Sequence, residues 1–260
     1  MTPPVALVTG ANKGIGLETA RQLGARGATV LAGARDAGRG RDAERALCAE
    51  GVDARFVSLD VTSEAAARQA AEWIDAEFGL LDILVNNAGI ATSGGPPSET
   101  SLAGLREVLE TNVLGVIAVT NAMLPLLRRA PAGRIVNVSS ELGSVTLMSD
   151  QSSPMWRLPP SVSYPVSKSA LNMVTAMYAR ELAGTPVKVN AANPGYCATD
   201  LNGHSGPRPA GEGASVSVHL ATLPADGPSG TFWGYRWVAV PPGTTTCCPG
   251  DRVRPPPRPG

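Results

Sequence analysis

Short, continuously apolar segments alternate along this chain with longer segments of helical composition, and no other feature of the sequence limits the possible folds as strongly. The apolar segments, at 5–9, 28–34, 55–59, 81–85, 134–138 and 187–191, are bounded by Gly, Pro or polar residues, so each predicts a buried strand. Helices are predicted between them, at 15–26, 36–50, 63–78, 102–129 and 163–182. Strands without polar alternation are buried on both faces, as in parallel sheets that are covered by helices.

The alternation predicts an α/β protein with a three-layer, doubly wound parallel sheet, the Rossmann fold, because right-handed crossovers place helices on both faces. We expect residues 1–232 to form a single domain. From residue 231 onward the chain carries four Arg, one Asp, many Pro and Gly and a cluster of aromatics, so 233–260 is expected to be an atypical, disordered tail. A frameshifted natural end and a genuine extension both stay open for this segment.

The charge balance and the cysteine content exclude several classes of protein. Lys and Arg (22) equal Asp and Glu (22), which argues against nucleic acid or an anionic membrane as the main partner. Apolar stretches such as 113–119 are shorter than the roughly 18 residues of a membrane span. Four Cys are too few for a disulfide framework, and no pair has zinc-ligand spacing, so no metal is expected. Residues 1–4 leave no room for a signal peptide, which predicts a cytoplasmic protein, with monomer and homo-oligomer both open.

The first predicted strand is followed by Thr-Gly-Ala-Asn-Lys-Gly-Ile-Gly at 9–16, directly before a helix. Gly10, Gly14 and Gly16 allow the backbone to turn tightly and to approach a pyrophosphate at the helix N-terminus. The spacing is G-x-x-x-G-x-G and not G-x-G-x-x-G, so the prediction depends on the position of the turn after the first strand. We expect this turn to bind a dinucleotide.

The end of the second predicted strand, Ala34-Arg35-Asp36, bears on the choice of dinucleotide. An acid at this place holds the adenosine ribose of NAD, whereas the planar guanidinium of Arg35 suits the 2′-phosphate of NADP. Lys13, inside the Gly-rich turn, is expected to point at the same phosphate, so NADP is preferred. Asp36 keeps NAD as the alternative, unless it caps the helix that follows.

Two further motifs indicate proton chemistry. Tyr164 and Lys168 are four residues apart on one face of a predicted helix, so the ammonium is expected to lower the pKa of the phenol toward the range of proton transfer. Ser139 and Ser140 follow the fifth predicted strand, at the sheet edge where ligands bind. A hydroxyl there can hydrogen-bond a carbonyl oxygen as this oxygen gains charge.

Taken in order, these motifs resemble those of one family. TGANKGIG (9–16), NNAG (86–89), Asn112, VNVSS (136–140), YPVSK (164–168) and NPGYCAT (193–199) are similar to motifs of the short-chain dehydrogenase/reductase family, and within it of NADPH-dependent carbonyl reductases. The resemblance covers about residues 4–205, and 215–223 and 229–232 are similar to the helix and last strand that end the family's domain. It implies an oxidoreductase that transfers hydride between NADP(H) and a carbonyl or alcohol carbon of a small-molecule substrate.

The resemblance also implies roles for individual residues. Tyr164 is expected to be the general acid in reduction and the base in oxidation. Lys168 is expected to lower its pKa and to hold the nicotinamide ribose, and Ser140 to orient the substrate carbonyl. Asn112 is expected to hold a water that connects Lys168 to solvent. The expected cofactor-binding residues are Gly10, Asn12, Lys13, Gly14, Ile15, Gly16, Arg35, Asp60 (at the adenine), Val61, Asn87, Ala88, Gly89, Tyr164, Lys168, and Pro194, Gly195 and Thr199 (at the nicotinamide).

The chain departs from the family between Ser140 and Tyr164, where 23 residues form a segment about twice the usual length. Loops of this length are usually functional or disordered. One hypothesis is that 141–163, which contains Trp156, partly covers the substrate site as a lid. The alternative is a loop without a substrate role.

Two other functions stay open beside the NADP-dependent reductase. The first is an NAD-dependent alcohol or hydroxysteroid-type dehydrogenase with the same catalytic residues. The second belongs to another class, a non-catalytic, nucleotide-sensing Rossmann protein. The presence of both Tyr164 and Lys168 argues against a sensor, because sensing requires no tyrosine with a tuned pKa.

Overall fold

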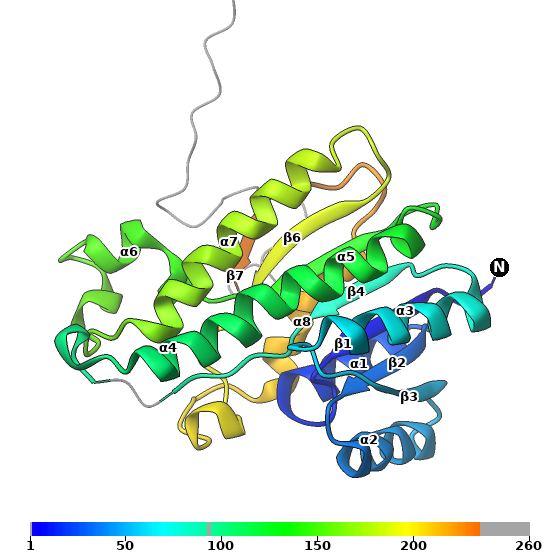
Figure 1. Cartoon of the computed structure of the whole chain (residues 1–260), viewed down its shortest axis with the longest axis horizontal. Coiled ribbons are helices and arrows are strands. Elements are labelled where there is room, and N and C mark those ends of the chain that lie inside the picture. Colours follow the sequence, from blue (N-terminus) through cyan, green and yellow to red (C-terminus); the bar gives the residue numbers. More distant parts are fainter. Residues whose placement is uncertain (1, 93–94, 235–260) are drawn as a thin grey trace, which may run out of the picture.

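Seven parallel strands form one sheet at the centre of the computed structural model, which describes residues 2–92 and 95–234 (Figure 1). Their order is β3-β2-β1-β4-β5-β6-β7, which is the doubly wound sheet predicted from the sequence. The winding reverses direction between β1 and β4, and open sheets of this kind bind ligands at the carboxyl ends of the strands near that point. The strands are β1 (Val5–Thr9), β2 (Thr29–Ala34), β3 (Ala54–Ser58), β4 (Ile83–Asn86), β5 (Arg134–Val138), β6 (Lys188–Asn193) and β7 (Phe232–Gly234).

Helices cover both faces of the sheet, as its apolar strands require (Figure 1). On one face α1, α2 and α8 bury Leu23, Leu47 and Leu220, and on the other α3 and α5 bury Ile74 and Met123. The helices are α1 (Gly14–Gly24), α2 (Ala37–Ala49), α3 (Glu64–Phe78), α4 (Leu102–Leu109), α5 (Gly115–Leu127), α6 (Val145–Ser149), α7 (Ser163–Glu181) and α8 (Ala210–Ala221), with the short turns η1 (Pro97–Glu99), η2 (Glu110–Leu114), η3 (Glu141–Gly143), η4 (Pro154–Arg157) and η5 (Asp200–Asn202).

α4, η2 and α5 form one continuous helical stretch, which ends two residues before the predicted end at 129. Pro125 lies in its last turn, where a missing N–H group and the ring favour termination. By length and composition this stretch is able to cross a membrane. Half of its most apolar window is buried inside the fold, where α5 packs on α3, and this is the environment of a core helix in a globular protein.

The last strand, β7, extends the predicted domain by two residues. The expected boundary at 232 divides this strand, since Trp233 and Gly234 pair with β6. The indole Nε1 of Trp233 donates to Thr231 Oγ1 at 2.6 Å, and the side chain packs against buried core residues. The remainder of the predicted tail, 235–260, lies outside the described residues.

A buried arginine ties the segment after α8 to the sheet. Arg134, the first residue of β5, is 3% exposed, and burial lowers the pKa of its guanidinium. The guanidinium donates to the carbonyl oxygens of Leu223 (2.8 and 3.1 Å), Pro224 (2.9 Å) and Pro186 (3.3 Å). Hydrogen bonds from a charged donor are the stronger kind, so Arg134 acts as a clamp between β5 and the segment that leads to β7.

Arg134→Met is expected to lower the free energy of unfolding by about 3 kcal/mol, because several carbonyl oxygens lose their buried donor. Urea denaturation followed by circular dichroism measures this change. Arg128→Met is the matched control, since Arg128 is exposed and pairs with Glu181 at 3.1 Å. The control is expected to change the stability by less than about 0.5 kcal/mol. Equal destabilisation by the two variants would contradict the role of Arg134 as a clamp.

Candidate active site

The Gly-rich turn leaves an open helix N-terminus beside the point where the winding of the sheet reverses. α1 begins at Gly14, and no side chain caps its first N–H groups. Gly10 and Gly14 adopt positive φ values of 63° and 55°, which residues with a Cβ rarely adopt. A Cβ at Gly16 would overlap the side-chain nitrogen of Asn87 and the carbonyl oxygen of Gly10. These features fit a pyrophosphate, which binds free N–H groups at a helix N-terminus.

The end of β4 holds the Gly-rich turn in place. Oγ1 of Thr9 accepts hydrogen bonds from the N–H groups of Asn87 and Ala88, both at 3.0 Å. Nδ2 of Asn87 donates to the carbonyl oxygens of Thr9 (2.9 Å) and Gly10 (3.2 Å). Asn87 and Ala88 therefore lie against the turn. Sequence reasoning missed Thr9, although its position at the end of β1, directly before Gly10, was a usable signal.

The two cations that were expected to share one phosphate have different surroundings. Arg35 follows β2, is exposed and makes no ion pair within the described part of the chain. The ammonium of Lys13 contacts Oδ2 of Asp200 at 2.6 Å, because the segment after β6 brings this carboxylate next to the Gly-rich turn. A contact between Lys13 and a 2′-phosphate thus stays a prediction. Asn12 and Ile15 are half-buried within the same turn.

Two of the acidic residues considered for the cofactor are bound locally. Oδ1 of Asp36 accepts from the N–H group of Arg39 at 2.9 Å, which makes Asp36 the N-cap of α2. Asp60, after β3, accepts from the N–H group and the hydroxyl of Thr62 at 3.0 and 2.7 Å. Its neighbour Val61 packs against the start of α5.

The segment after β6 approaches the Gly-rich turn from the other side. Pro194 and Gly195 directly follow the strand, and Gly195 has a positive φ of 75°. Thr199 is the N-cap of η5, and its methyl carbon would lie 3.5 Å from a Cβ at Gly14. The fold therefore places Thr199 against the turn, although the two are distant in the sequence.

Tyr164 and Lys168 lie at the start of α7, against the carboxyl end of β5. Lys168 is buried, and its Nζ donates to the carbonyl oxygen of Val138 at 2.8 Å and lies 5.4 Å from the centre of the Tyr164 ring. Burial lowers the pKa of Lys168 to about 8, because desolvation disfavours the charged form. Burial also raises the pKa of Tyr164 to about 12, and hydrogen bonding with the Ser140 hydroxyl acts in the opposite direction.

The direction of this shift differs from the expectation that Lys168 lowers the pKa of Tyr164. Desolvation of the phenol is the largest influence on Tyr164, and the Lys168 ammonium directs its hydrogen bond to a backbone carbonyl instead of the phenol oxygen. The phenol therefore stays protonated at neutral pH, which is the form that a general acid needs.

Further polar contacts fix α7 on β5. Oγ of Ser139 donates to Asn172 at 2.6 Å, and Nδ2 of Asn137 donates to Thr175 at 2.9 Å. Nδ2 of Asn86, in β4, donates in turn to Asn137 at 2.9 Å. Sequence reasoning did not identify Asn86, Asn137, Asn172 or Thr175 as part of the site. A polar side chain within the apolar segment 134–138 was the signal for Asn137.

Asn112 lies in the π-helical turn η2 and is fully buried. Its Oδ1 accepts from the N–H group of Ile90 at 2.9 Å, and its Nδ2 donates to the carbonyl oxygen of Ile90 at 2.9 Å and to Ser167 Oγ at 3.0 Å. A Cβ at Gly89 would lie 3.3 Å from Asn112 and 3.8 Å from Nζ of Lys168. The side chain of Asn112 thus joins the segment after β4 to α7, at a π turn of the kind that is frequent at functional sites.

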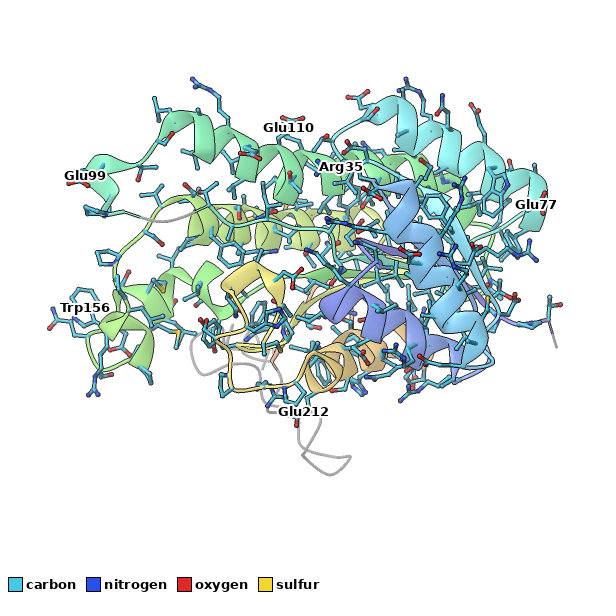
Figure 2. The ribbon with its side chains drawn as sticks, turned by 90° about the horizontal axis from the view of Figure 1, so that it is seen from below. Arg35, Glu77, Glu99, Glu110, Trp156 and Glu212 are labelled. Atoms are coloured by element: carbon cyan, nitrogen blue, oxygen red, sulfur yellow. The ribbon has the colours of Figure 1, made fainter. Side chains whose placement is uncertain are left out.

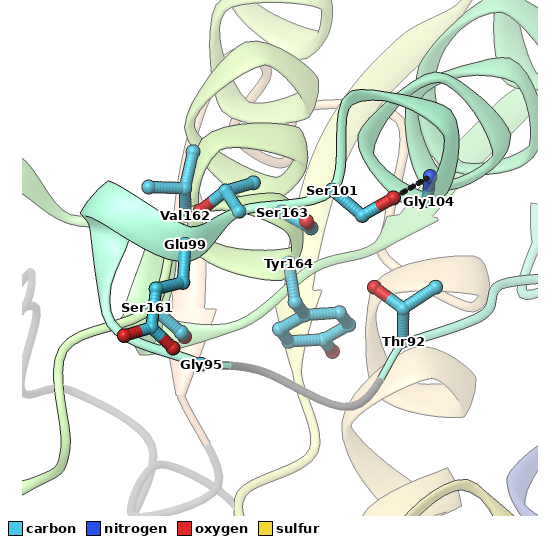
Figure 3. A pocket seen from close by; sticks show the side chains of 10 residues that line it. Thr92, Gly95, Glu99, Ser101, Gly104, Ser161, Val162, Ser163 and Tyr164 are labelled. Carbon is cyan, nitrogen blue, oxygen red and sulfur yellow. Dashed lines mark hydrogen bonds between the residues drawn. The ribbon is translucent and has the colours of Figure 1, made fainter.

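A cavity of about 320 Å³ opens beside Tyr164 (Figure 3). Its walls come from the segment after β4, from η1 and the start of α4, and from the end of the 141–163 segment, including Ser161 and Ser163. Trp156 is 50% exposed at the outer end of the molecule, where it points into solvent, and it does not line this cavity (Figure 2). The long segment therefore contributes its last residues to the cavity wall, whereas Trp156 lies away from it, and a lid role for this residue stays a prediction.

Comparisons with known proteins agree with this geometry. The sequence profile of the short chain dehydrogenase family matches residues 4–209. The short-chain dehydrogenase anuI of Penicillium roqueforti is 38% identical over 230 residues, which cover 85% of this chain and 90% of that protein. Carbonyl reductase (NADPH) 1 of Sus scrofa is 34% identical, with 90% and 97% covered. The NADPH-bound carbonyl reductase from chicken fatty liver superimposes with a TM-score of 0.79 at 28% identity, with 91% and 98% covered. The chain belongs to the short chain dehydrogenase family of oxidoreductases.

Proposed function

We propose that this protein is an NADP-dependent carbonyl reductase, which transfers hydride between NADP(H) and a carbonyl or alcohol carbon of a small molecule. The observation that carries the proposal is the buried contact of Lys168 with Val138 beside Tyr164, at the same sheet edge as an open helix N-terminus. Similarity to carbonyl reductase (NADPH) 1 over 90% of the chain supports the same reaction.

The residues present fit a dinucleotide that carries a 2′-phosphate. The free N–H groups of α1 would hold the pyrophosphate, and the exposed guanidinium of Arg35 would hold the 2′-phosphate. Asp36 is used as the cap of α2, which leaves the adenosine ribose without the acid that NAD enzymes use. When bound, the nicotinamide supplies or accepts the hydride. The remaining cofactor contacts are assigned to Asp60, Val61, Asn87, Ala88, Gly89, Pro194, Gly195 and Thr199.

In reduction, Tyr164 donates its proton to the carbonyl oxygen as this oxygen gains negative charge. The Ser140 hydroxyl hydrogen-bonds with the phenol and orients the same oxygen. Lys168 places a positive charge beside the phenolate that forms, which favours release of the proton. In oxidation Tyr164 takes up the proton as the base.

Asn112 is assigned to the resupply of this proton, through a water near Lys168. Both N–H donors of its side chain already bind protein groups, at Ile90 and Ser167. The side chain therefore positions the start of α7, and we assign the binding of the water to backbone groups of the π turn.

Tyr164→Phe is expected to lower kcat for NADPH-dependent reduction by at least about 100-fold, because the proton donor is removed. NADPH oxidation with a panel of aldehydes, ketones and quinones measures the loss. Tyr178→Phe is the matched control on the same helix, since its hydroxyl bonds to Asn121 at the surface, and it is expected to retain activity. A Tyr164→Phe variant as fast as an active parent enzyme would rule out this mechanism, and a parent that oxidises NADPH with no compound of the panel would favour the sensor.

The rate of reduction is expected to fall as the pH rises through about 8. The lowered pKa of Lys168 means that its ammonium loses a proton there, while Tyr164, with a pKa near 12, stays protonated. The profile of kcat/KM against pH between 6 and 10 tests this expectation in roughly half-unit steps. In Lys168→Arg the cation does not titrate in this range, so kcat/KM should no longer fall as the pH rises. Its highest value is expected to be lower than that of the parent. A parent profile that is flat to pH 10 would show that the charge on Lys168 is not needed.

Arg35→Ala is expected to raise the dissociation constant for NADPH by about tenfold or more, and to leave that for NADH nearly unchanged, because only NADPH carries the 2′-phosphate. Titration calorimetry measures both constants without a substrate. Arg45→Ala is the control, since Arg45 pairs with Asp42 on the exposed face of α2. A preference for NADH that Arg35→Ala does not alter would support the NAD-dependent alternative.

A further inference from the structure

The cavity beside Tyr164 carries a carboxylate that is not neutralised. Glu99, the last residue of η1, lines this cavity and is exposed to it. Within the described part of the chain, no side chain forms an ion pair with the Glu99 carboxylate and no group donates a hydrogen bond to it. Figure 3 shows the Glu99 side chain extending from η1 along one side of the cavity, with Tyr164 between it and Thr92.

The rest of the lining is polar and contains no cation. Among the described residues that form the walls, Val162 is the only large apolar side chain, and Lys, Arg and His are absent. Hydroxyl groups make up most of the remainder: Thr92, Thr100, Ser101, Ser161, Ser163 and Tyr164. Of the five serines and threonines, only Ser101 uses its side chain within the described residues, where it accepts from the N–H group of Gly104 at 3.3 Å. The other hydroxyls are free to bind a polar ligand.

This arrangement of charge selects for one class of ligand. A carboxylate at neutral pH attracts a cation and repels an anion, and the attraction strengthens when a ligand displaces water from the cavity. Hydroxyl groups that lose water need new hydrogen-bond partners, so a polar ligand fits this cavity better than a hydrocarbon of the same size. Phosphorylated or carboxylated substrates meet no compensating positive charge in these walls.

We propose that the preferred substrate carries a protonated amine in addition to its carbonyl group, and that Glu99 is the residue that selects it. The carbonyl faces Tyr164, and the ammonium lies toward η1, where the Glu99 carboxylate accepts its hydrogen bonds. This inference rests on the proposed function, because Tyr164 marks the end of the cavity at which reduction occurs. Glu99 then determines specificity and takes no part in proton transfer.

Three benzaldehydes of similar shape test the inference by kcat/KM with NADPH. They carry, in the para position, a dimethylaminomethyl group, which is protonated at neutral pH, its neutral isostere isobutyl, or a carboxymethyl group. In the parent enzyme the cationic compound is expected to be the best substrate and the anionic compound the worst. Glu99→Gln is expected to lower the ratio of kcat/KM for the cationic over the neutral compound by roughly three- to tenfold, the effect of one charge in a partly solvated site.

Glu107→Gln is the matched control, because it removes the same charge from a residue that is exposed on α4 and does not line the cavity. The control is expected to keep the parent's ratio of kcat/KM for the cationic over the neutral compound. If Glu99→Gln leaves the ratio unchanged, or if Glu107→Gln lowers it equally, Glu99 does not select the substrate and the inference is wrong.

A binding measurement separates this inference from the proposed function. Protonated N,N-dimethylbenzylamine has no carbonyl, so its affinity can be measured by saturation-transfer NMR without turnover. Binding to the parent several-fold tighter than to Glu99→Gln supports the inference, and equal binding overturns it. Failure of all three aldehydes to oxidise NADPH would contradict the proposed reductase, and this binding comparison would then decide the role of Glu99 by itself.

Discussion

The polar contacts between α7 and β5 fix the position of Tyr164, and the rest of the site depends on them. Lys168 binds the carbonyl oxygen of Val138, the last residue of β5, and Asn172 and Thr175 bind the side chains of the two residues that flank it, Ser139 and Asn137. A slip of α7 by one residue would break all three contacts and leave buried donors and acceptors unpaired, at about 1–3 kcal/mol each. Apolar packing alone is less specific, since hydrophobic side chains tolerate small displacements. The register of α7, and with it the position of the phenol, is therefore set by hydrogen bonds.

The segment that leaves β4 connects the two halves of the site. At its start, Asn87 binds the Gly-rich turn through Thr9. At its end, Ile90 is held by both polar groups of the Asn112 side chain, which also reaches α7 through Ser167. One short piece of chain thus touches the place proposed for the pyrophosphate and the helix that carries the proton donor. Gly89 lies between them, where a Cβ would come within 3.3 Å of the Asn112 side chain, so a larger residue would fit there only if Asn112 shifted.

Burial gives similar charges different properties in this protein. Lys168 lies inside the fold, where desolvation lowers its pKa to about 8. Lys13 lies at the surface and pairs with Asp200, whose carboxyl pKa is lowered by that contact. The Glu99 carboxylate is exposed to a polar cavity and has no such partner among the described residues. The proposed role of Glu99 in substrate selection uses this carboxylate.

The sequence by itself determined the fold class and the identity of the chemical groups. Unbroken apolar strands that alternate with helices are typical of a parallel sheet covered on both faces, and the Gly-rich turn, the tyrosine and the lysine occur in motifs whose local geometry follows from spacing. Strand and helix limits differed from the prediction by only a few residues, and β7 ran two residues past the expected boundary.

Only the tertiary structure decided the contacts between distant segments. It paired Lys13 with Asp200, closed Asn112 on Ile90 and brought Glu99 to the cavity wall that holds Tyr164. It also decided the pKa of Tyr164, which spacing predicted to fall and burial raises. Spacing along a helix reports which side chains are neighbours, whereas a pKa depends on how much water is removed from all sides. That second quantity is set by residues far apart in the chain, so no local pattern can contain it.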